Sequence, residues 1–258
     1  MRQAKQRTFA GAVCYQTVYS LPDRVRDVKK YEPRPRFKDA EERQKHKLGI
    51  SRRRHAKEFN ENFSPTSLYS TLTFSDEWEV HDFQSAKRVR NNFLRVLKRA
   101  YPDAVIYMYV GRGKSTHRIH LHMVSEGVPK DFIDVKWKYG TVKRIDNLRK
   151  NNYYDGVNHG QDYTGLANYL FDHWTQEVGG HRWLKTKNAR EPQAEKPTEV
   201  HIRGGYNLER SPIPPKGYTL VETKATKYGF FFYKYVITPQ KRPYIRRKQS
   251  TDSEDRFD

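Results

Sequence analysis

The fold of this chain is decided by residues 105–124, VIYMYVGRGKSTHRIHLHMV. The pattern predicts two β-strands joined by a basic turn that contains glycine. Side chains alternate between the two faces of a strand, so His120 and His122 share one face while Ile119 and Leu121 share the other. The apolar face is predicted to pack in a core. The other face either binds a metal ion through two imidazoles or is a half-exposed surface that happens to carry two histidines.

The chain is strongly basic. Its 258 residues include 50 lysines and arginines against 30 acidic residues, which gives a formal net charge of +20. Such an excess predicts a polyanionic partner, and nucleic acid is the usual one. A membrane surface would be the competing polyanion, but the sequence has no apolar run of spanning length, no signal-peptide core and no lipidation motif. We therefore expect a soluble, cytoplasmic protein with no membrane partner.

The cysteine count limits the kind of metal site. A single cysteine, Cys14, excludes an intramolecular disulfide and a cysteine-based zinc cluster. Any metal ion would have to be held by histidine and carboxylate side chains. Such ligands favour Mg²⁺ or Mn²⁺ over structural zinc.

The segments around the histidine strand predict an α+β fold. Residues 68–74 alternate as in a strand, and residues 82–100 place apolar side chains along one stripe, as in an amphipathic helix. Pro102 ends that helix, and a further strand is predicted around residues 142–145. The order strand, helix, strand, strand indicates a central, mainly antiparallel sheet with helices packed on it.

The N-terminal region is less regular. Residues 1–39 are basic and interrupted by prolines, which suggests a loosely ordered arm with a short strand at 12–19. Residues 39–59 predict a polar, mostly basic helix. The arginine run on that helix either contacts DNA phosphates or forms a solvated face. Its members are Arg52, Arg53 and Arg54.

The C-terminal half adds a helix and more strands. Residues 147–162 have the composition of a loop, and a helix follows from about residue 163. Strands are predicted at 197–204 and within the aromatic segment 217–237, most of whose rings are expected in a core. The charged C-terminal tail is expected to be disordered.

The tyrosines near the predicted helix are candidate nucleophiles. Tyrosine is a poor nucleophile in water because, with a pKa of about 10, only about one molecule in a thousand is phenolate at pH 7. A divalent ion compensates by neutralising charge on a phosphodiester. A His-x-His strand facing a tyrosine-bearing helix therefore suits DNA nicking through a phosphotyrosine. Tyr163 and Tyr169 are separated by about 240° of helix rotation, so only one can face the phosphate.

Other tyrosines and the basic turn have simpler interpretations. Tyr153 and Tyr154 lie in the loop and suit stacking on unpaired bases. The turn GRGKST is not a Walker A loop, because Met108 stands where its first glycine should fall. The basic residues of this region either contact the DNA backbone or only keep the hairpin soluble. They are Arg112, Lys114 and Arg118.

Three motifs, in this order, resemble motifs 1, 2 and 3 of the HUH-type rolling-circle replication initiators. They are STLTF at 70–74, RIHLHMV at 118–124 and GLANYL at 165–170. The resemblance covers roughly residues 36–195. It is strongest to replication-associated proteins of bacterial phages and mobile elements that are related to those of filamentous phages.

The resemblance implies a site-specific single-strand DNA endonuclease and strand transferase that initiates rolling-circle replication. By motif, His120 and His122 would bind Mg²⁺ or Mn²⁺, and Tyr169 would cleave one strand at the origin. The tyrosine attaches to the 5′ phosphate and leaves a 3′ hydroxyl that primes synthesis. Tyr163 is the second candidate for this role. The chain has no helicase motor, so a separate helicase and a DNA polymerase are expected partners beside single-stranded origin DNA.

The chain departs from the family in two places. Many relatives carry a glutamate as third metal ligand where this chain has Val, Gly and Arg at 110–112. The third ligand is therefore open among His117, Glu126, a residue beyond the motif and water. Relatives also tend to have a lysine three residues after the tyrosine, where this chain has Asp172 followed by His173. The group that orients the tyrosine is open too, with His117 and His173 as possible assisting residues.

Other functions stay open at this point. The missing glutamate favours a non-catalytic nucleic-acid-binding protein that keeps the fold, and a relaxase or single-tyrosine transposase would share the same chemistry. The expected organisation has four parts. They are a basic arm with a polar helix at 1–65, a nicking domain at 66–195, a β-rich extension at 196–238 and a disordered tail at 239–258.

Overall fold

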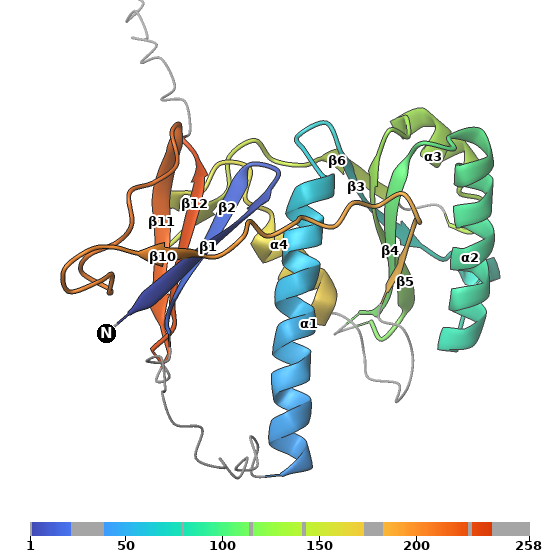
Figure 1. Ribbon diagram of the computed structural model, residues 1–258. Coiled ribbons are helices and arrows are strands. Elements are labelled where there is room, and N and C mark those ends of the chain that lie inside the picture. Colours follow the sequence, from blue (N-terminus) through green and yellow to red (C-terminus); the bar gives the residue numbers. More distant parts are fainter. Residues whose placement is uncertain are drawn as a thin grey trace, which may run out of the picture.

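Two antiparallel five-stranded sheets lie on either side of the long helix α1 (Ala40–Asn62) in the computed structural model of the chain (Figure 1). The structure describes residues 2–21, 39–78, 80–113, 116–140, 143–172, 183–226 and 229–238. Every strand pairing among these residues is antiparallel. The expected α+β class with a mainly antiparallel sheet is therefore confirmed.

The first sheet, which we call the histidine sheet, contains the strand with both histidines at its centre. Its order is β6-β3-β5-β4-β9. The bounds are β3 (Leu68–Thr73), β4 (Val105–Arg112), β5 (Ile119–Glu126), β6 (Lys143–Asn147) and β9 (Trp183–Lys185). In this register His120 lies between Thr73 of β3 and Gly111 of β4, and His122 lies between Thr71 and Tyr109.

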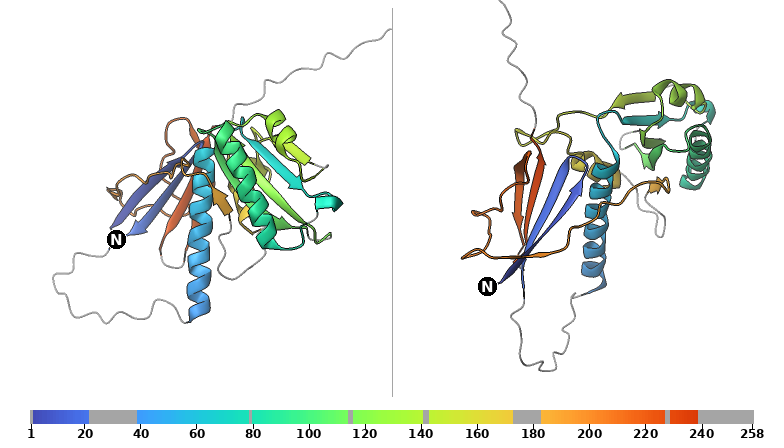
Figure 2. Two further views of the ribbon diagram at one scale, coloured as in Figure 1. Left: turned by 90° about the vertical axis from the view of Figure 1, so that its right-hand side faces the viewer. Right: turned by 45° about the horizontal axis from the view of Figure 1, so that its top comes forward.

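One face of the histidine sheet is covered by α2 (Phe83–Ala100) and α3 (Lys130–Lys136), which lie on its outer side in Figures 1 and 2. Asp82 caps the first of these helices by accepting a hydrogen bond from the Ser85 backbone N–H at 2.8 Å. The apolar side chains of β5 point into this core together with residues of both helices. The alternation predicted from the histidine stretch is confirmed.

The opposite face of the histidine sheet packs against α1 and α4 (Thr164–Asp172). The second half of α1 is buried there, and Phe59 is fully covered. α1 therefore begins as the polar helix that the sequence predicts and ends as a core element. The short elements η1 (Asp76–Trp78), β7 (Tyr153–Tyr154) and β8 (Val157–Asn158) complete this part of the chain.

The second sheet, which we call the accessory sheet, joins the two ends of the described chain. Its order is β10-β1-β2-β12-β11. The bounds are β1 (Gln3–Ala10), β2 (Val13–Ser20), β10 (Thr198–Val200), β11 (Tyr218–Ala225) and β12 (Phe231–Ile237). The short strand expected at 12–19 is β2, but the rest of residues 3–20 is not a loosely ordered arm: β1 and β2 form a hairpin, and β2 pairs with β12. The expected arm and β-rich extension thus share one sheet, because strands far apart in sequence pair here.

Several expectations fall on other parts of the chain. The tail at 239–258 lies outside the described residues, as do Lys114 and His173. The aromatic segment at 217–237 is two strands rather than one. Of its described rings, those of Tyr233 and Tyr235 are buried as expected, whereas those of Phe230 and Phe232 are exposed. Among the described residues, no helix is both long and apolar enough to cross a membrane.

The β1–β2 turn touches the end of α1 closely. Gly11 has φ +55°, and a β-carbon there would lie 2.1 Å from the Asn60 carbonyl oxygen. We expect Gly11→Ala to lower the free energy of unfolding by about 2–4 kcal/mol, measured by chemical denaturation. Gly156, with φ +78° and no heavy atom near its β-carbon position, is the matched control. Gly156→Ala should cost only about 1 kcal/mol, and equal losses would contradict the close approach.

The buried His55 of α1 makes stability depend on pH. Its Nε2 lies 2.7 Å from the Tyr109 hydroxyl, and burial, with the nearby Lys185 charge, lowers the pKa of His55 to about 3. The unfolded chain takes up this proton at about pH 6.5. Between these values only the unfolded state is protonated, so stability falls as the pH drops from about 6.5 toward 3.

We therefore expect His55→Gln to flatten the pH dependence of the unfolding free energy by up to about 1.4 kcal/mol per pH unit in this window. Denaturation curves at several pH values measure the slope. His81→Gln, which changes an exposed histidine, is the control. A slope that His55→Gln leaves unchanged would show that His55 is protonated in the folded protein.

Candidate functional site

The two histidines of β5 converge on the α4 side of the histidine sheet. The Nε2 atoms of His120 and His122 are 3.0 Å apart, and the two rings are nearly perpendicular at 84°. His122 is buried, whereas His120 is half-buried. Gly111, the β4 partner of His120, leaves that flank without a side chain. The pair is therefore rigidly held and can still be approached.

Hydrogen bonds orient both imidazoles. Nδ1 of His120 lies 3.3 Å from the Arg118 carbonyl oxygen, which can only accept, so Nδ1 carries the proton and Nε2 presents a lone pair. Nδ1 of His122 lies 2.8 Å from the Tyr69 hydroxyl, which can donate or accept. The Thr71 hydroxyl lies 3.3 Å from the same nitrogen. Burial lowers the pKa of His120, which favours the neutral ring that ligates metal ions.

The two imidazoles are spaced so that they could occupy two neighbouring coordination positions of one divalent metal ion. Neighbouring ligands of an octahedral ion at about 2.1 Å from the metal are about 3.0 Å apart, which matches the separation of the two Nε2 atoms. Polar partners like those of His120 and His122 commonly fix the orientation of histidines that ligate a metal. Among the described residues, no third His, Cys, Asp or Glu completes a metal-binding group with the pair.

The two expected candidates for the third ligand lie elsewhere. Glu126 is at the far end of β5, where its carboxylate accepts hydrogen bonds from hydroxyl groups of the loop before β3. These hydroxyls belong to Ser64, Thr66 and Ser67. His117 is exposed in the β4–β5 turn, with φ 54°. Neither residue joins His120 and His122.

Tyr169 of α4 lies beside the histidine pair. Its ring centroid is 5.9 Å from that of His122, with the rings inclined at 66°. The Tyr69 ring is stacked against His122 at 5.7 Å, so the imidazole contacts two tyrosines. Tyr169 is 48% exposed, which leaves room for a substrate at its hydroxyl. The structure thus brings together the two histidines and the preferred tyrosine.

Tyr163 occupies a different environment. It is buried ahead of α4, and its hydroxyl donates to the Arg149 carbonyl at 3.1 Å. Burial and the charge of Glu126 raise its pKa well above the ordinary value. A buried, protonated hydroxyl already engaged with a carbonyl is a structural group. The structure therefore separates the two tyrosines, with Tyr169 at the histidines. The helix rotation does not explain the separation, because Tyr163 lies just before α4.

The tyrosines of the preceding loop also differ from each other. Tyr153 is 64% exposed. Tyr154 is half-buried, packs against Gly165 and donates to the Asp162 carbonyl at 3.2 Å. Of the two, Tyr153 alone is as accessible as base stacking requires.

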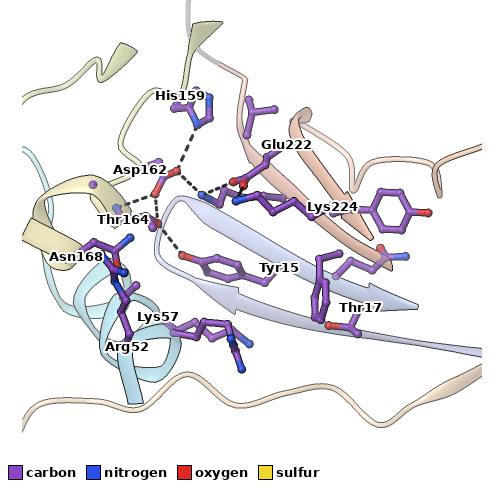
Figure 3. A pocket seen from close by; sticks show the side chains of 18 of the residues that line it. Tyr15, Thr17, Arg52, Lys57, His159, Asp162, Thr164, Asn168, Glu222 and Lys224 are labelled. Atoms are coloured by element: carbon purple, nitrogen blue, oxygen red, sulfur yellow. Dashed lines mark hydrogen bonds and ion pairs between the residues drawn. The ribbon is translucent and has the colours of Figure 1, made fainter. Parts of the chain in front are cut away.

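An ion-pair network fixes the start of α4 (Figure 3). The buried carboxylate of Asp162 accepts from the Thr164 backbone N–H at 2.9 Å and pairs with Lys234 of β12 at 3.2 Å. Burial alone would raise the pKa of Asp162, but Lys234 and Thr164 outweigh it and lower the pKa. Asn60 of α1 accepts from the Tyr163 N–H at 2.8 Å. The accessory sheet and α1 therefore hold the start of the helix that carries Tyr169.

Sequence reasoning missed Tyr69 and the Asp162 network. Asp162 stands where a helix cap is expected, just before the predicted helix, so a local signal existed. Tyr69 shares a strand face with Thr71, but its contact with His122 depends on the pairing of β3 with β5. Lys234 lies far away in sequence, and nothing local identifies it as the partner of Asp162.

The arginine run on α1 divides by role. Arg52 donates to Asn168 at 3.2 Å and pairs with Asp172, so it ties α1 to α4. Arg54 pairs with Glu58 and Glu191. Arg53 is exposed and forms no ion pair with any residue in the described part of the chain. The alternatives of phosphate contact and solvated face thus apply to Arg53, whereas Arg52 and Arg54 link elements.

The basic residues around the β4–β5 turn are also divided. Arg112 lies on the α2 side of the sheet, with its guanidinium 5.2 Å from the Phe83 ring centroid, and so faces away from the histidine pair. Arg118 donates to the Phe74 carbonyl at 3.1 Å and pairs with Asp76 at 2.8 Å. Of these two described residues, Arg118 is the one connected to the pair, through its carbonyl contact with His120.

The comparisons with known proteins add no relative to this description. No protein-family model, curated protein or solved structure matches the chain.

Proposed function

We propose that this chain is a metal-dependent, site-specific single-strand DNA endonuclease and strand transferase that initiates rolling-circle replication. The observation that carries the proposal is the position of Tyr169 beside the convergent imidazoles of His120 and His122. A net charge of +20 supports a nucleic-acid substrate. Single-stranded origin DNA is the substrate, and a separate helicase and DNA polymerase are the cytoplasmic partners.

The reaction is a transfer of one phosphodiester bond. The Tyr169 hydroxyl attacks the phosphorus of the scissile phosphate, a new tyrosine O–P bond forms, and the bond to the 3′ oxygen breaks. The hydroxyl loses its proton, and the departing 3′ oxygen gains one. The number of phosphodiester bonds is unchanged, so attack by a 3′ hydroxyl on the phosphotyrosine rejoins a strand without an external energy source.

The side chains of the site mainly supply orientation. His120 and His122 would hold Mg²⁺ or Mn²⁺, which when bound neutralises charge on the non-bridging phosphate oxygens. The Arg118 carbonyl and Tyr69 fix the two imidazoles from behind. The capped helix α4 holds the Tyr169 hydroxyl on a rigid element, which favours attack because little conformational freedom remains to be lost.

Near the end of α4 the chain carries an acidic residue where the family tends to have a basic one. Asp172 stands where relatives tend to have a lysine, and it pairs with Arg52 of α1. A cation from another helix is thus held at the same turn of α4. This pairing supports a role for Arg52 in keeping the tyrosine helix in place over the histidines.

A non-catalytic nucleic-acid-binding protein is the second candidate function. It is favoured by the absence of a third His, Cys, Asp or Glu ligand among the described residues. Metal dependence of a covalent reaction distinguishes the two candidates. A relaxase or a single-tyrosine transposase would use the same groups on a different DNA substrate.

The nucleophile is testable by adduct formation. We expect wild-type protein, incubated with Mn²⁺ and single-stranded DNA of the replicon that encodes it, to form a covalent adduct that resists denaturing electrophoresis. Tyr169→Phe should abolish the adduct, because it removes the attacking oxygen. Tyr163→Phe, which removes a buried hydroxyl, is the control and should retain it. A mapped phosphotyrosyl peptide containing Tyr163 instead would overturn the assignment.

The histidines are testable by separating chemistry from binding. We expect His120→Ala and His122→Ala to abolish nicking even with added Mn²⁺, while non-specific DNA affinity stays close to wild type, because lysine and arginine contacts supply most of that affinity. Gel assays of nicking and fluorescence anisotropy measure the two quantities. His117→Ala is the matched control and should nick normally. Full nicking by the double variant would refute the metal site.

A further inference from the structure

A groove of about 1190 Å³ lies between the accessory sheet and the helices α1 and α4 (Figure 3). One wall is formed by the two helices and the other by β2, β11 and β12. The volume exceeds the roughly 300–1,000 Å³ of small-molecule pockets. Asn168 of α4 lines this groove, whereas the next residue, Tyr169, faces His122. The groove and the candidate active site are therefore separated by one helix.

Two cations on the groove wall lack carboxylate partners. The other four basic side chains that line it form ion pairs; these are Arg52, Arg54, Lys224 and Lys234. Arg53 and Lys57, one turn apart on α1, form no ion pair with any residue in the part of the chain that the structure describes. Lys57 is half-buried, with its Nζ 5.3 Å from the ring centroid of Tyr15 on β2. Figure 3 shows Lys57 on the α1 side of the groove.

The environment of Lys57 is unfavourable for a cation in the free protein. Burial, and then the charge of Arg53, lower the pKa of Lys57. The contact with the Tyr15 ring offsets only part of the lost hydration. A bound anion would relieve both the desolvation and the repulsion between Lys57 and Arg53. The positive charges on the α1 wall of the groove therefore favour binding of an anion.

The opposite wall carries exposed aromatic rings. Phe232 of β12 lines the groove and is 37% exposed, and Phe230 is 40% exposed. Their rings are stacked nearly parallel, at 6.4 Å and 13°. Tyr19 of β2 continues the row at 6.0 Å from Phe230. Lys224 is the cross-strand neighbour of Phe232. Exposed rings next to cations form the combination that binds unpaired nucleotides.

We propose that this groove binds single-stranded DNA, with bases stacked on Phe230 and Phe232 and backbone phosphates at Arg53 and Lys57. The inference rests on the proposed nicking function and adds a second contact for the strand outside the histidine site. Duplex DNA would leave the aromatic rings unused, because its bases are stacked on each other. An acidic protein segment could meet the cations, but it gives no reason for a row of parallel rings.

The test is binding of a fluorescein-labelled oligothymidylate to the full chain, measured by anisotropy in EDTA so that no bond is broken. We expect Phe232→Leu to weaken binding at least about five-fold, because it keeps apolar bulk but removes the aromatic face. Phe232→Tyr, which keeps that face, should bind close to wild type. This pair of variants distinguishes base stacking from simple apolar docking.

The role of Lys57 is tested by the salt dependence of oligothymidylate binding. Lys57→Gln should lower the slope of log affinity against log salt by about 0.7, the value for one contact with a single strand. Lys130→Gln, which removes an exposed cation of α3, should leave the slope unchanged. The unfolding temperature of Lys57→Gln should not fall, because the substitution removes an uncompensated half-buried charge. A binding defect without a stability defect is not expected of a purely structural residue.

The outcomes separate this proposal from the nicking function. Unchanged affinity and salt slope in Phe232→Leu and Lys57→Gln would overturn the groove assignment and leave the adduct test on Tyr169 unaffected. Failure of wild-type protein to bind the oligonucleotide would overturn it too. Loss of the adduct with normal groove binding would instead reject the nickase and leave a single-strand-binding protein.

Discussion

Strand β5 is buried on both faces, and this constraint organises the rest of the molecule. Its apolar side chains enter the core under α2 and α3, while His122 and Val124 face α1 and α4. A polar group in such a position must be hydrogen-bonded, because burial removes its hydration. Tyr69 and the Arg118 carbonyl meet this requirement and fix the imidazoles. The need to bury β5 on both sides therefore also determines how the histidines point.

The accessory sheet contributes to the same arrangement from a distance. Lys234 of β12 pairs with Asp162, which caps the helix that carries Tyr169. Lys234 also pairs with Glu222 at 2.8 Å, so one ammonium group neutralises two carboxylates. Removing one partner of a buried ion pair costs far more than the pair contributes, because the remaining charge is left uncompensated. The start of α4 thus depends on residues of the accessory sheet, whose strands come from the two ends of the described chain.

Local signals in the sequence predicted the histidine sheet well. Alternation identified β3 and β5, and the apolar stripe with Pro102 identified α2. Strands were expected at 12–19, 197–204 and 217–237, where β2, β10, β11 and β12 lie, but their assembly into the accessory sheet was missed. The pairing between β2 and β12 joins segments more than two hundred residues apart and leaves no local pattern. The two tyrosines do lie in different environments, but not because of the predicted helix rotation, since Tyr163 precedes α4. The side of the sheet on which Arg112 lies was also predictable from the sequence. In a strand every second side chain shares a face, so Arg112 lies on the same face of β4 as the buried Met108 and Val110.

Net charge alone could not assign roles to the basic residues, because it counts every cation equally. Arg52 and Arg54 are neutralised within the protein, where they join α1 to other elements. Arg53 and Lys57 point from the same helix into the groove without a carboxylate partner among the described residues. An internal ion pair weakens the attraction of a cation for an external phosphate, whereas a lone cation retains it. Along residues 52–57 of α1, the cations that form no ion pair with a described residue therefore face the groove, next to the helix that presents Tyr169.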